Sequence, residues 1–341
     1  MKRVPKSDVE LTKADFSNDQ MVKWCPGCGD HAILSSVLGV FPKVGHKKEN
    51  YCVVSGIGCS SRFPYYVNTY GFHSIHGRAN AIATGVKIAN PKLSVWVSTG
   101  DGDSMAIGGN HFIHVVRRNI DINIMLFNNE IYGLTKGQYS PTTKMGKVTK
   151  TSPFGTIEQP FNPGELVIGA QGTFFARALD VNVKLMGEVL LHAAEHDGAS
   201  VTEILQNCVI FNDKTHKEIT DKEVREDRTI VLEHGKPMIF GKDNNKGLVL
   251  DGFNLKVVTI GENGITEKDI LVHDAKCEDN ILHYKLATMG GDLPLALGVI
   301  RDYIAPTYDE DFEKQIEEVQ AKNPIRTLKE YLLSGETWEV K

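Results

Sequence analysis

Strand-like and helix-like segments alternate regularly between residues 51 and 129, and this order limits the folds open to the chain. Three short apolar runs have the length and composition of buried parallel strands: 51–58, 93–103 and 121–129. The segments between them, 76–90 and 104–119, carry alanine and aliphatic residues at helical spacing. Repeated strand–helix–strand units build one sheet of parallel strands covered by helices. We therefore predict an α/β fold with a doubly wound, mostly parallel sheet.

The alternation continues to about residue 211 and then gives way to short, charged segments. Beyond residue 309, the sequence predicts two amphipathic helices separated at Asn323 and Pro324, since proline cannot continue a helix. We expect one α/β module at 1–211 and a C-terminal α+β extension at 212–341.

Charge and hydropathy exclude several classes of protein. The 38 Lys and Arg residues are outnumbered by 43 Asp and Glu residues, so the chain has no excess of basic residues to neutralise nucleic acid. No apolar run reaches the roughly 18 residues that cross a bilayer, and the first residues contain no apolar core typical of a signal peptide. We therefore expect a cytoplasmic protein that binds neither nucleic acid nor membrane.

Oxygen-bearing side chains follow two successive strands. Gly100, Asp101 and Gly102 come directly after one strand, and 25 residues separate Gly102 from Asn128 and Asn129, which end the next. The carboxyl ends of parallel strands are where doubly wound sheets bind anions. Carboxylate and amide oxygens suit Mg²⁺ or Ca²⁺, and glycines let a phosphate approach the backbone. A lone Gly-Asp-Gly is more often a tight turn, but the pair at this spacing indicates a metal and diphosphate site.

The cysteines are too few for a disulfide scaffold, so any that matter are expected to be ligands or redox groups. Cys25 and Cys28 form a Cys-Pro-Gly-Cys turn, a spacing used by zinc, redox dithiols and iron–sulfur clusters alike. A cluster needs two more thiolates, and Cys59 and Cys208 follow strands at the predicted ligand-binding edge. The weaker candidates are Cys52, at the start of an apolar strand, and Cys277, in the divergent region.

The pattern of GDG, 25 residues and NN resembles the thiamine-diphosphate motif. Residues 100–119 and 131–143 resemble the β subunits of 2-oxoacid:ferredoxin oxidoreductases, and the likeness covers about residues 21–211. Two short segments of the extension, 289–302 and 334–340, are also similar. The resemblance implies the thiamine-diphosphate module fold for 1–211. It implies that 212–341 covers the cluster and contacts other subunits.

The resemblance also implies a role for each matching residue. The Mg²⁺ ligands would be Asp101, Asn129 and the backbone carbonyl of Ile131. The diphosphate would contact Gly102, Asp103, Gly133 and Leu134. The rest of the thiamine diphosphate would lie against Ile57, Gly58, Cys59, Ser60 and His76. One 4Fe-4S cluster would be held by Cys25, Cys28, Cys59 and Cys208.

By the same resemblance, the reaction is CoA-dependent oxidative decarboxylation of 2-oxoglutarate to succinyl-CoA and CO₂, with electrons leaving through the cluster to ferredoxin. Lys136 would contact the distal carboxylate of 2-oxoglutarate, although a solvated loop lysine is the plain alternative. The α subunit would supply the glutamate that faces the aminopyrimidine, so the chain would be inactive alone. No GxGxxG fingerprint follows a strand, which disfavours a dinucleotide site.

Several alternatives remain open at this point. A pyruvate or broad-specificity 2-oxoacid enzyme fits the same motifs, and a non-oxidative thiamine enzyme would need no cluster. A zinc-stabilised binding protein would use Gly-Asp-Gly and Asn-Asn only as turns. Arg78 and His73 flank His76 and are equally well explained as a helix-start arginine and a loop histidine.

Overall fold

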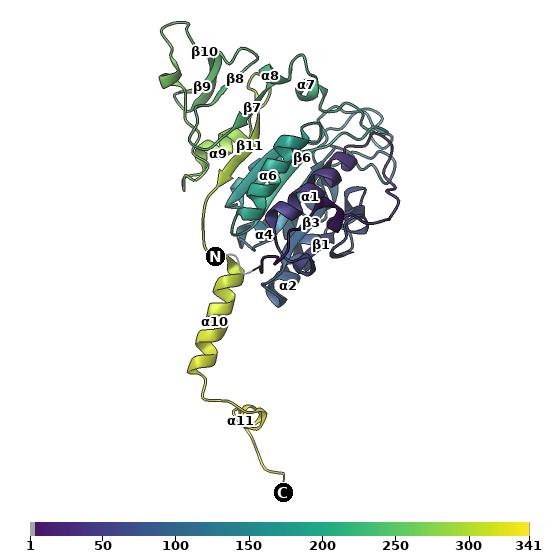
Figure 1. Cartoon of the computed structure of the whole chain (residues 1–341), viewed down its shortest axis with the longest axis vertical. Coiled ribbons are helices and arrows are strands. Elements are labelled where there is room, and N and C mark those ends of the chain that lie inside the picture. Colours follow the sequence, from purple (N-terminus) through teal and green to yellow (C-terminus); the bar gives the residue numbers. More distant parts are fainter. Residues whose placement is uncertain (1–3, 341) are drawn as a thin grey trace.

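The body of the protein is built on an eight-stranded sheet (Figure 1). The computed structural model describes residues 4–340. The strands of this sheet are β1 (Tyr51–Ser55), β2 (Tyr70–His73), β3 (Ser94–Gly100), β4 (Asn123–Asn128), β5 (Phe174–Leu179), β6 (Ser200–Leu205), β7 (Thr229–Leu232) and β11 (Leu295–Asp302). Their order is β2-β1-β3-β4-β6-β5-β11-β7, and the pairs from β2 to β5 are all parallel. The predicted doubly wound, mostly parallel sheet is confirmed.

Helices cover both faces of this sheet. The helices that precede the tail are α1 (Asp30–Val44), α2 (Ala79–Ala89), α3 (Asp101–Met105), α4 (Gly109–Arg117), α5 (Pro163–Gly169), α6 (Val183–Glu195), α7 (Lys217–Thr220), α8 (Arg225–Arg228) and α9 (Ile281–Ala287). Short 3-10 helices are η1 (Lys13–Phe16), η2 (Lys48–Asn50), η3 (Ser60–Tyr65) and η4 (Glu267–Asp269). Helices α1 and α6 pack on one face, and α2, α4, α5 and α9 pack on the other. Within residues 4–340, no helix combines the length and apolar character needed to cross a bilayer.

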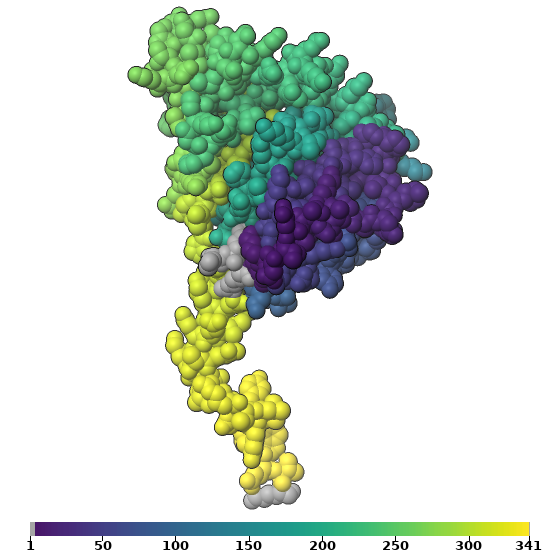
Figure 2. Space-filling view, viewed as in Figure 1, coloured from purple at the N-terminus to yellow at the C-terminus, as the bar shows by residue number. Residues whose placement is uncertain are grey.

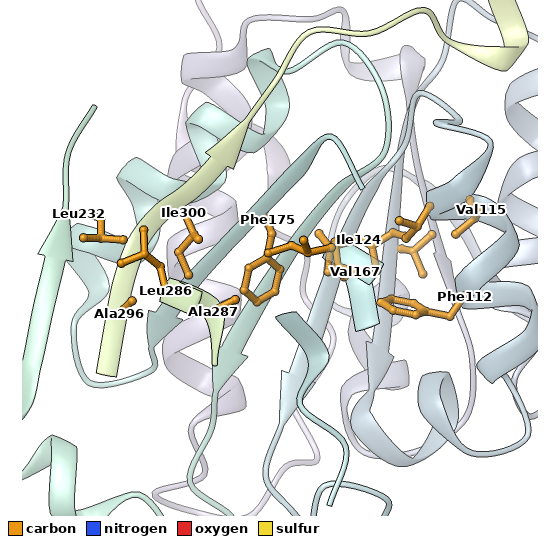
Figure 3. Packing of buried hydrophobic residues seen from close by; sticks show 14 of the residues in the cluster. Phe112, Val115, Ile124, Val167, Phe175, Leu232, Leu286, Ala287, Ala296 and Ile300 are labelled. Atoms are coloured by element: carbon orange, nitrogen blue, oxygen red, sulfur yellow. The ribbon is translucent and has the colours of Figure 1, made fainter. Parts of the chain in front are cut away.

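Burial on both faces explains why the strands are continuously apolar. In β1, Tyr51 and Val53 belong to the apolar cluster under α1 and α6, whereas Cys52 and Val54 belong to the opposite cluster. Successive side chains of a strand point to opposite faces, so a strand covered on both sides needs an apolar residue at every position. Figure 3 shows the second cluster running from α4 across the sheet to α9 and β11.

The segment after the Gly-Asp-Gly turn differs from the sequence-based expectation of one helix. It forms two helices, α3 and α4, separated at 106–108. A Cβ atom on Gly108 would lie 2.5 Å from the carbonyl oxygen of Asp103 and 3.0 Å from the Cα of Gly77. The break therefore lets the backbone of Gly108 pack directly against the loop that precedes α2.

The C-terminal region joins the same sheet. Strand β11 pairs antiparallel with β5 and parallel with β7, so two strands from beyond residue 211 extend the main sheet. A small antiparallel sheet stands beside it, formed by β8 (Ile239–Phe240), β9 (Lys246–Asp251) and β10 (Asn254–Thr259). The predicted boundary at 211 does not coincide with an edge of the sheet, and the division of function there stays a prediction.

The two helices predicted for the tail are present as α10 (Tyr308–Lys322) and α11 (Leu328–Leu332). Figures 1 and 2 show them extending away from the body of the protein. Asn323 ends α10, and the chain is not helical at Pro324, as the sequence predicts.

A buried ion pair connects the main sheet to the C-terminal region. Arg177 on β5 donates through Nε to the Oε2 atom of Glu203 on β6 at 2.7 Å, and both side chains are 3% exposed. The other guanidinium nitrogens of Arg177 donate to the carbonyls of Ala287 and Ala296, which belong to α9 and β11. The second carboxylate oxygen of Glu203 accepts a hydrogen bond from Asn128 at 2.8 Å. One arginine therefore links three strands and a helix.

We predict that Arg177→Met lowers the free energy of unfolding by about 3–5 kcal/mol, because Glu203 would be left as an uncompensated buried charge. Urea denaturation of the purified chain measures the change. Lys184→Met is the matched control, since Lys184 pairs with Glu188 at an exposed site and should contribute less than about 1 kcal/mol. Equal losses in the two variants would contradict the structural role given to Arg177.

Candidate functional site

Asp101 lies at the carboxyl end of β3, where the chain leaves the sheet and begins α3. Its side chain is buried, and its Oδ2 atom accepts hydrogen bonds from the hydroxyls of Ser140 and Thr142. Burial raises the pKa of Asp101 to about 6, and the two hydroxyls oppose this shift. Both hydroxyls bond to the same oxygen, so the other, Oδ1, accepts no hydrogen bond from a side chain, and the backbone N–H of Gly102 also lowers the pKa of the acid. A bound cation would also stabilise the charge of this buried acid.

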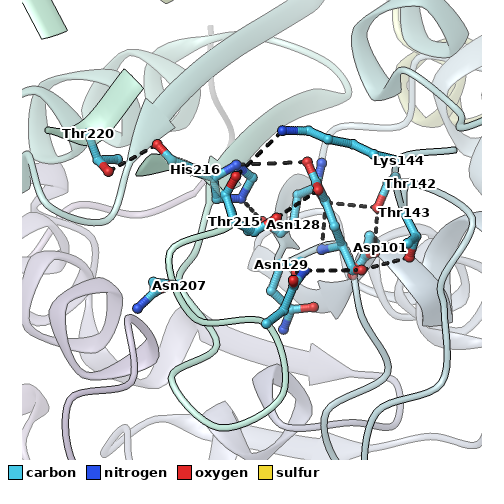
Figure 4. A network of polar contacts seen from close by, with 12 residues as sticks. Asp101, Asn128, Asn129, Thr142, Thr143, Lys144, Asn207, Thr215, His216 and Thr220 are labelled. Atoms are coloured by element: carbon cyan, nitrogen blue, oxygen red, sulfur yellow. Dashed lines mark hydrogen bonds and ion pairs between the residues drawn. The ribbon is translucent and has the colours of Figure 1, made fainter. Parts of the chain in front are cut away.

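The two asparagines at the end of β4 have different hydrogen-bond partners. Asn128 donates to Glu203, and its Oδ1 atom lies 2.9 Å from the hydroxyl oxygen of Thr142, the same hydroxyl that contacts Asp101 (Figure 4). Asn129 instead accepts, through Oδ1, the backbone N–H of Ile131 at 3.1 Å. A carbonyl oxygen has two lone pairs, so Oδ1 of Asn129 retains one for a metal ion.

The residues predicted to bind thiamine diphosphate and Mg²⁺ line one cavity, here called the cofactor cavity. They are Ile57, Gly58, Cys59, Ser60, His76, Asp101, Gly102, Asp103, Asn129, Ile131, Gly133 and Leu134. The cavity is formed by the loops that follow β1, β2, β3 and β4, as expected for a parallel sheet. Asp101, Asn129 and Ile131, the three predicted metal ligands, therefore line the same space, and the chemistry of this donor set fits Mg²⁺. The individual role of each residue stays a prediction.

The carboxylate of Asp103 holds two loops of this cavity together. Its Oδ1 atom accepts the backbone N–H groups of Gly77 at 2.8 Å and Ile57 at 3.2 Å. Its Oδ2 atom accepts the hydroxyl of Thr99 at 2.9 Å, and a Cβ atom on Gly56 would lie 1.7 Å from it. Since this side chain already has three donors, the predicted contact of residue 103 with a diphosphate is best made by its backbone N–H.

Tyr132 covers Gly102. A Cβ atom at position 102 would lie 2.2 Å from the Cε1 atom of Tyr132, so only glycine fits under this ring. The tyrosine hydroxyl donates to the carbonyl of Gly102 at 3.1 Å. Burial, with the nearby charges of Asp101 and Asp103, raises the pKa of Tyr132 to about 12, so the phenol stays neutral.

The four cysteines predicted as cluster ligands line a second cavity of about 340 Å³, here called the cysteine cavity; they are Cys25, Cys28, Cys59 and Cys208. The loop after β4, residues 129–134, is here called the metal loop. Its Gly133 packs against two of the thiols, because a Cβ atom on Gly133 would lie 3.4 Å from the sulfur of Cys208 and 3.7 Å from that of Cys59. A four-iron cluster takes four thiolates, which is the number of cysteines that line this cavity, and the cluster itself stays a prediction. Among residues 4–340, no three His, Cys, Asp or Glu side chains are arranged around a single metal ion.

Local contacts bring the Cys-Pro-Gly-Cys turn to the loop after β1. The backbone N–H of Cys28 donates to the carbonyl of Cys25 at 3.0 Å, which closes the turn. The indole N–H of Trp24 donates to the carbonyl of Cys59 at 2.7 Å. Burial raises the pKa of Cys28 strongly and that of Cys59 to about 12, so these thiols would lose their protons on binding a metal.

The two cavities adjoin one another. Both are lined by Asp30, Cys59, Asn129, Gly133, Leu134 and Gln206. Lys136 lines the cysteine cavity, and its φ of 78° is unusual for a residue other than glycine. Lys136 therefore lies beside the predicted thiol ligands, and its contact with a substrate stays a prediction.

Four weaker candidates lie outside both cavities. Cys52 is buried in β1 and Cys277 is exposed, in accord with their lower ranking from the sequence. Arg78 contacts the ring of His111, and the ring of His73 bonds to the carbonyl of Ser74.

Sequence reasoning did not single out several residues of the site. Trp24, Tyr132, Ser140, Thr142 and Gln206 each bond to a predicted ligand or to its backbone. The segment 131–143 carried the family resemblance, which was a signal for three of them. Nothing in the pattern around Trp24 or Gln206 indicates a role.

Comparison with known proteins identifies related chains. A family profile described as thiamine pyrophosphate enzyme, C-terminal TPP binding domain, matches residues 56–204. The 2-oxoglutarate oxidoreductase subunit KorB of Mycobacterium tuberculosis is 48% identical over 99% of this chain and 91% of its own length. The 2-oxoglutarate synthase subunit KorB of Archaeoglobus fulgidus is 40% identical over 68% of this chain and 82% of its own. Subunit beta of 2-oxoacid:ferredoxin oxidoreductase 1 from Aeropyrum pernix is 44% identical over 59% of this chain and 63% of its own.

A solved structure has the same fold over nearly the whole chain. It is the 2-oxoglutarate:ferredoxin oxidoreductase from Magnetococcus marinus with 2-oxoglutarate, coenzyme A and succinyl-CoA bound. The TM-score is 0.77 at 30% identity, and the match covers 97% of this chain and 98% of that one.

We predict that Gly102→Ala displaces the ring of Tyr132 and reduces the thiamine diphosphate retained by the purified protein to a small fraction of the wild-type amount. Gly109→Ala is the control, because a Cβ atom at this position of α4 meets no other atom within 4 Å. Cofactor content by chromatography and thermal unfolding are measured together for both variants. Full cofactor retention in Gly102→Ala would contradict the tight contact with Tyr132.

Proposed function

The chain belongs to the β subunits of the 2-oxoacid:ferredoxin oxidoreductases, and we propose that it serves the CoA-dependent oxidation of 2-oxoglutarate to succinyl-CoA and CO₂. The observation that carries this proposal is the common wall of the cofactor cavity and the cysteine cavity. When bound, thiamine diphosphate supplies the decarboxylation of a 2-oxoacid, and a four-iron cluster takes up electrons one at a time. Adjacent cavities would place these two groups within reach of one another.

The cofactor cavity suits Mg²⁺ and a diphosphate. Asp101 and Asn129 would hold the metal through their side chains, and Ile131 through its backbone carbonyl. The hydroxyls of Ser140 and Thr142 orient the carboxylate of Asp101. The residues of this chain therefore bind and orient the cofactor.

The cysteine cavity suits a 4Fe-4S cluster, with Cys25, Cys28, Cys59 and Cys208 as ligands. Electrons would pass from the cluster to a one-electron carrier, and the family name indicates ferredoxin. This outlet distinguishes the proposal from a non-oxidative thiamine enzyme, which has no use for a second, thiol-lined cavity beside the first.

Lys136 would contact the distal carboxylate of 2-oxoglutarate. It lines the cysteine cavity and comes two residues after Leu134, which lines both cavities. A lysine ammonium is a compact charge that suits a second carboxylate, which pyruvate lacks.

The α subunit would complete the site. Ile75, Ile107 and Leu134 are large apolar side chains that are more than half exposed, and they lie on loops that form or adjoin the cofactor cavity. An apolar surface beside an active site is typical of a subunit contact. We propose that the α subunit covers it and supplies the glutamate that faces the aminopyrimidine.

The αβ enzyme, co-expressed and purified without oxygen, should reduce viologen in a CoA-dependent reaction with 2-oxoglutarate and much less with pyruvate. We predict that Lys136→Met lowers kcat/KM for 2-oxoglutarate about 10- to 100-fold, since a hydrogen bond to a charged group is lost, and changes kcat/KM for pyruvate far less. Lys147→Met, at an exposed position of the following loop, is the control. Activity with pyruvate but none with 2-oxoglutarate would reject the substrate assignment.

We predict reciprocal losses when one ligand of each site is removed. Asp101→Ala should lose thiamine diphosphate and Mg²⁺ but keep its iron, because the metal bridges the protein and the diphosphate. Cys28→Ala should lose iron and keep thiamine diphosphate, whereas Cys277→Ser should keep both. Metal analysis and cofactor extraction provide the readout. Unchanged iron content in Cys28→Ala would show that the ligand assignment is wrong.

A further inference from the structure

Gln206 lies in the wall between the two cavities and lines both of them. It follows β6 directly, and its backbone N–H donates to the carbonyl of Asn128 at 2.9 Å, which fixes it beside the end of β4. The residue is 1% exposed. A buried amide must satisfy both its oxygen and its nitrogen within the protein.

The contact with Asn129, a predicted metal ligand, determines the orientation of the Gln206 amide. The backbone N–H of Ile131 can only donate, so the atom of Asn129 that faces it must be the oxygen Oδ1. The Nδ2 atom of Asn129 therefore faces Gln206, where it donates to Oε1 at 2.9 Å. The oxygen of Gln206 points to the predicted metal ligand.

The contacts with Asn207 and Cys28 independently require the same orientation. The Nε2 atom of Gln206 donates to the carbonyl of Asn207 at 2.6 Å, and a carbonyl oxygen can only accept. The same nitrogen donates to the sulfur of Cys28 at 3.3 Å. The oxygen of Gln206 therefore faces a donor, Asn129, and its nitrogen faces two acceptors, Asn207 and Cys28. The amide cannot be reversed without losing these hydrogen bonds.

We propose that Gln206 is a positioning residue shared by the two sites, which orients Asn129 toward the metal ion and donates a hydrogen bond to the Cys28 thiolate of the cluster. The inference rests on the proposed function, since it assigns a role toward both cofactors. A hydrogen bond to a thiolate ligand stabilises the more negative, reduced state of a cluster and so makes its reduction potential less negative. A hydrogen bond to the side chain of a metal ligand fixes its direction and strengthens metal binding.

Two substitutions separate the two contacts in the αβ enzyme purified without oxygen. Gln206→Glu keeps an acceptor for Asn129 but loses the donor to Cys28, and Gln206→Leu loses both without adding charge. Redox titration followed by EPR gives the midpoint potential of the cluster, and titration with Mg²⁺ gives the concentration needed to bind thiamine diphosphate. Asn207→Ala is the matched control, because its side chain bonds to Asp213 and to the backbone of Lys214.

Both variants should have a cluster that is about tenfold harder to reduce, which is about 59 mV more negative for a one-electron couple. Gln206→Leu should also require about tenfold more Mg²⁺, whereas Gln206→Glu should stay close to wild type in this respect. Asn207→Ala should match wild type in both measurements.

An unchanged midpoint potential in Gln206→Leu, at full iron content, would overturn the inference while leaving the proposed function intact. Wild-type enzyme without iron would overturn both. If the variants do not retain a cluster, wild-type enzyme labelled with ¹⁵N in its glutamine side chains decides the matter by pulsed EPR of the reduced cluster. A ¹⁵N coupling is expected across the N–H to sulfur contact, and its absence would refute the contact.

Discussion

The site depends on the parallel pairing of β1, β3, β4 and β6. Parallel strands bring their carboxyl ends to one edge of the sheet, so four loops from distant parts of the chain meet there. Pairing of Gly100 with Phe127, and of Asn128 with Leu205, sets the Asp101 turn, the asparagine pair and the loop of Cys208 beside one another. A change of register by one residue would turn every side chain of a strand to the opposite face and disperse the site.

Buried polar groups at this edge are used in three distinct ways. Asp103 accepts hydrogen bonds from three donors and thereby holds two loops together. Asp101, two residues earlier, receives two hydroxyls on one oxygen, and the other oxygen would bind the proposed cation. Glu203 pairs with Arg177 and accepts a hydrogen bond from Asn128. The neighbouring aspartates of one short motif therefore have different tasks, which follow from the donors that surround each of them.

The adjoining cavities give the two-cofactor proposal its physical basis. The metal loop contributes to both, since Asn129 and Gly133 line each cavity and Gly133 lies against two of the thiols. With both cavities occupied as proposed, the shared residues would hold the two groups close together without a mobile carrier between them. The relatedness to 2-oxoglutarate oxidoreductase subunits agrees with this arrangement and was anticipated from the motifs at 100–119 and 131–143.

The sequence by itself determined the doubly wound sheet, the strand-end position of Asp101 and Asn129, and the family, because periodic burial and short motifs are written locally in the chain. Only the tertiary structure decided which oxygen of Asp101 is occupied, that the Gly-Asp-Gly helix breaks at Gly108, and that β7 and β11 join the main sheet. It also decided that Gln206 meets Cys28, 178 residues away. Contacts of this kind depend on strand register and loop packing, and no local pattern in the sequence records which distant groups will face one another.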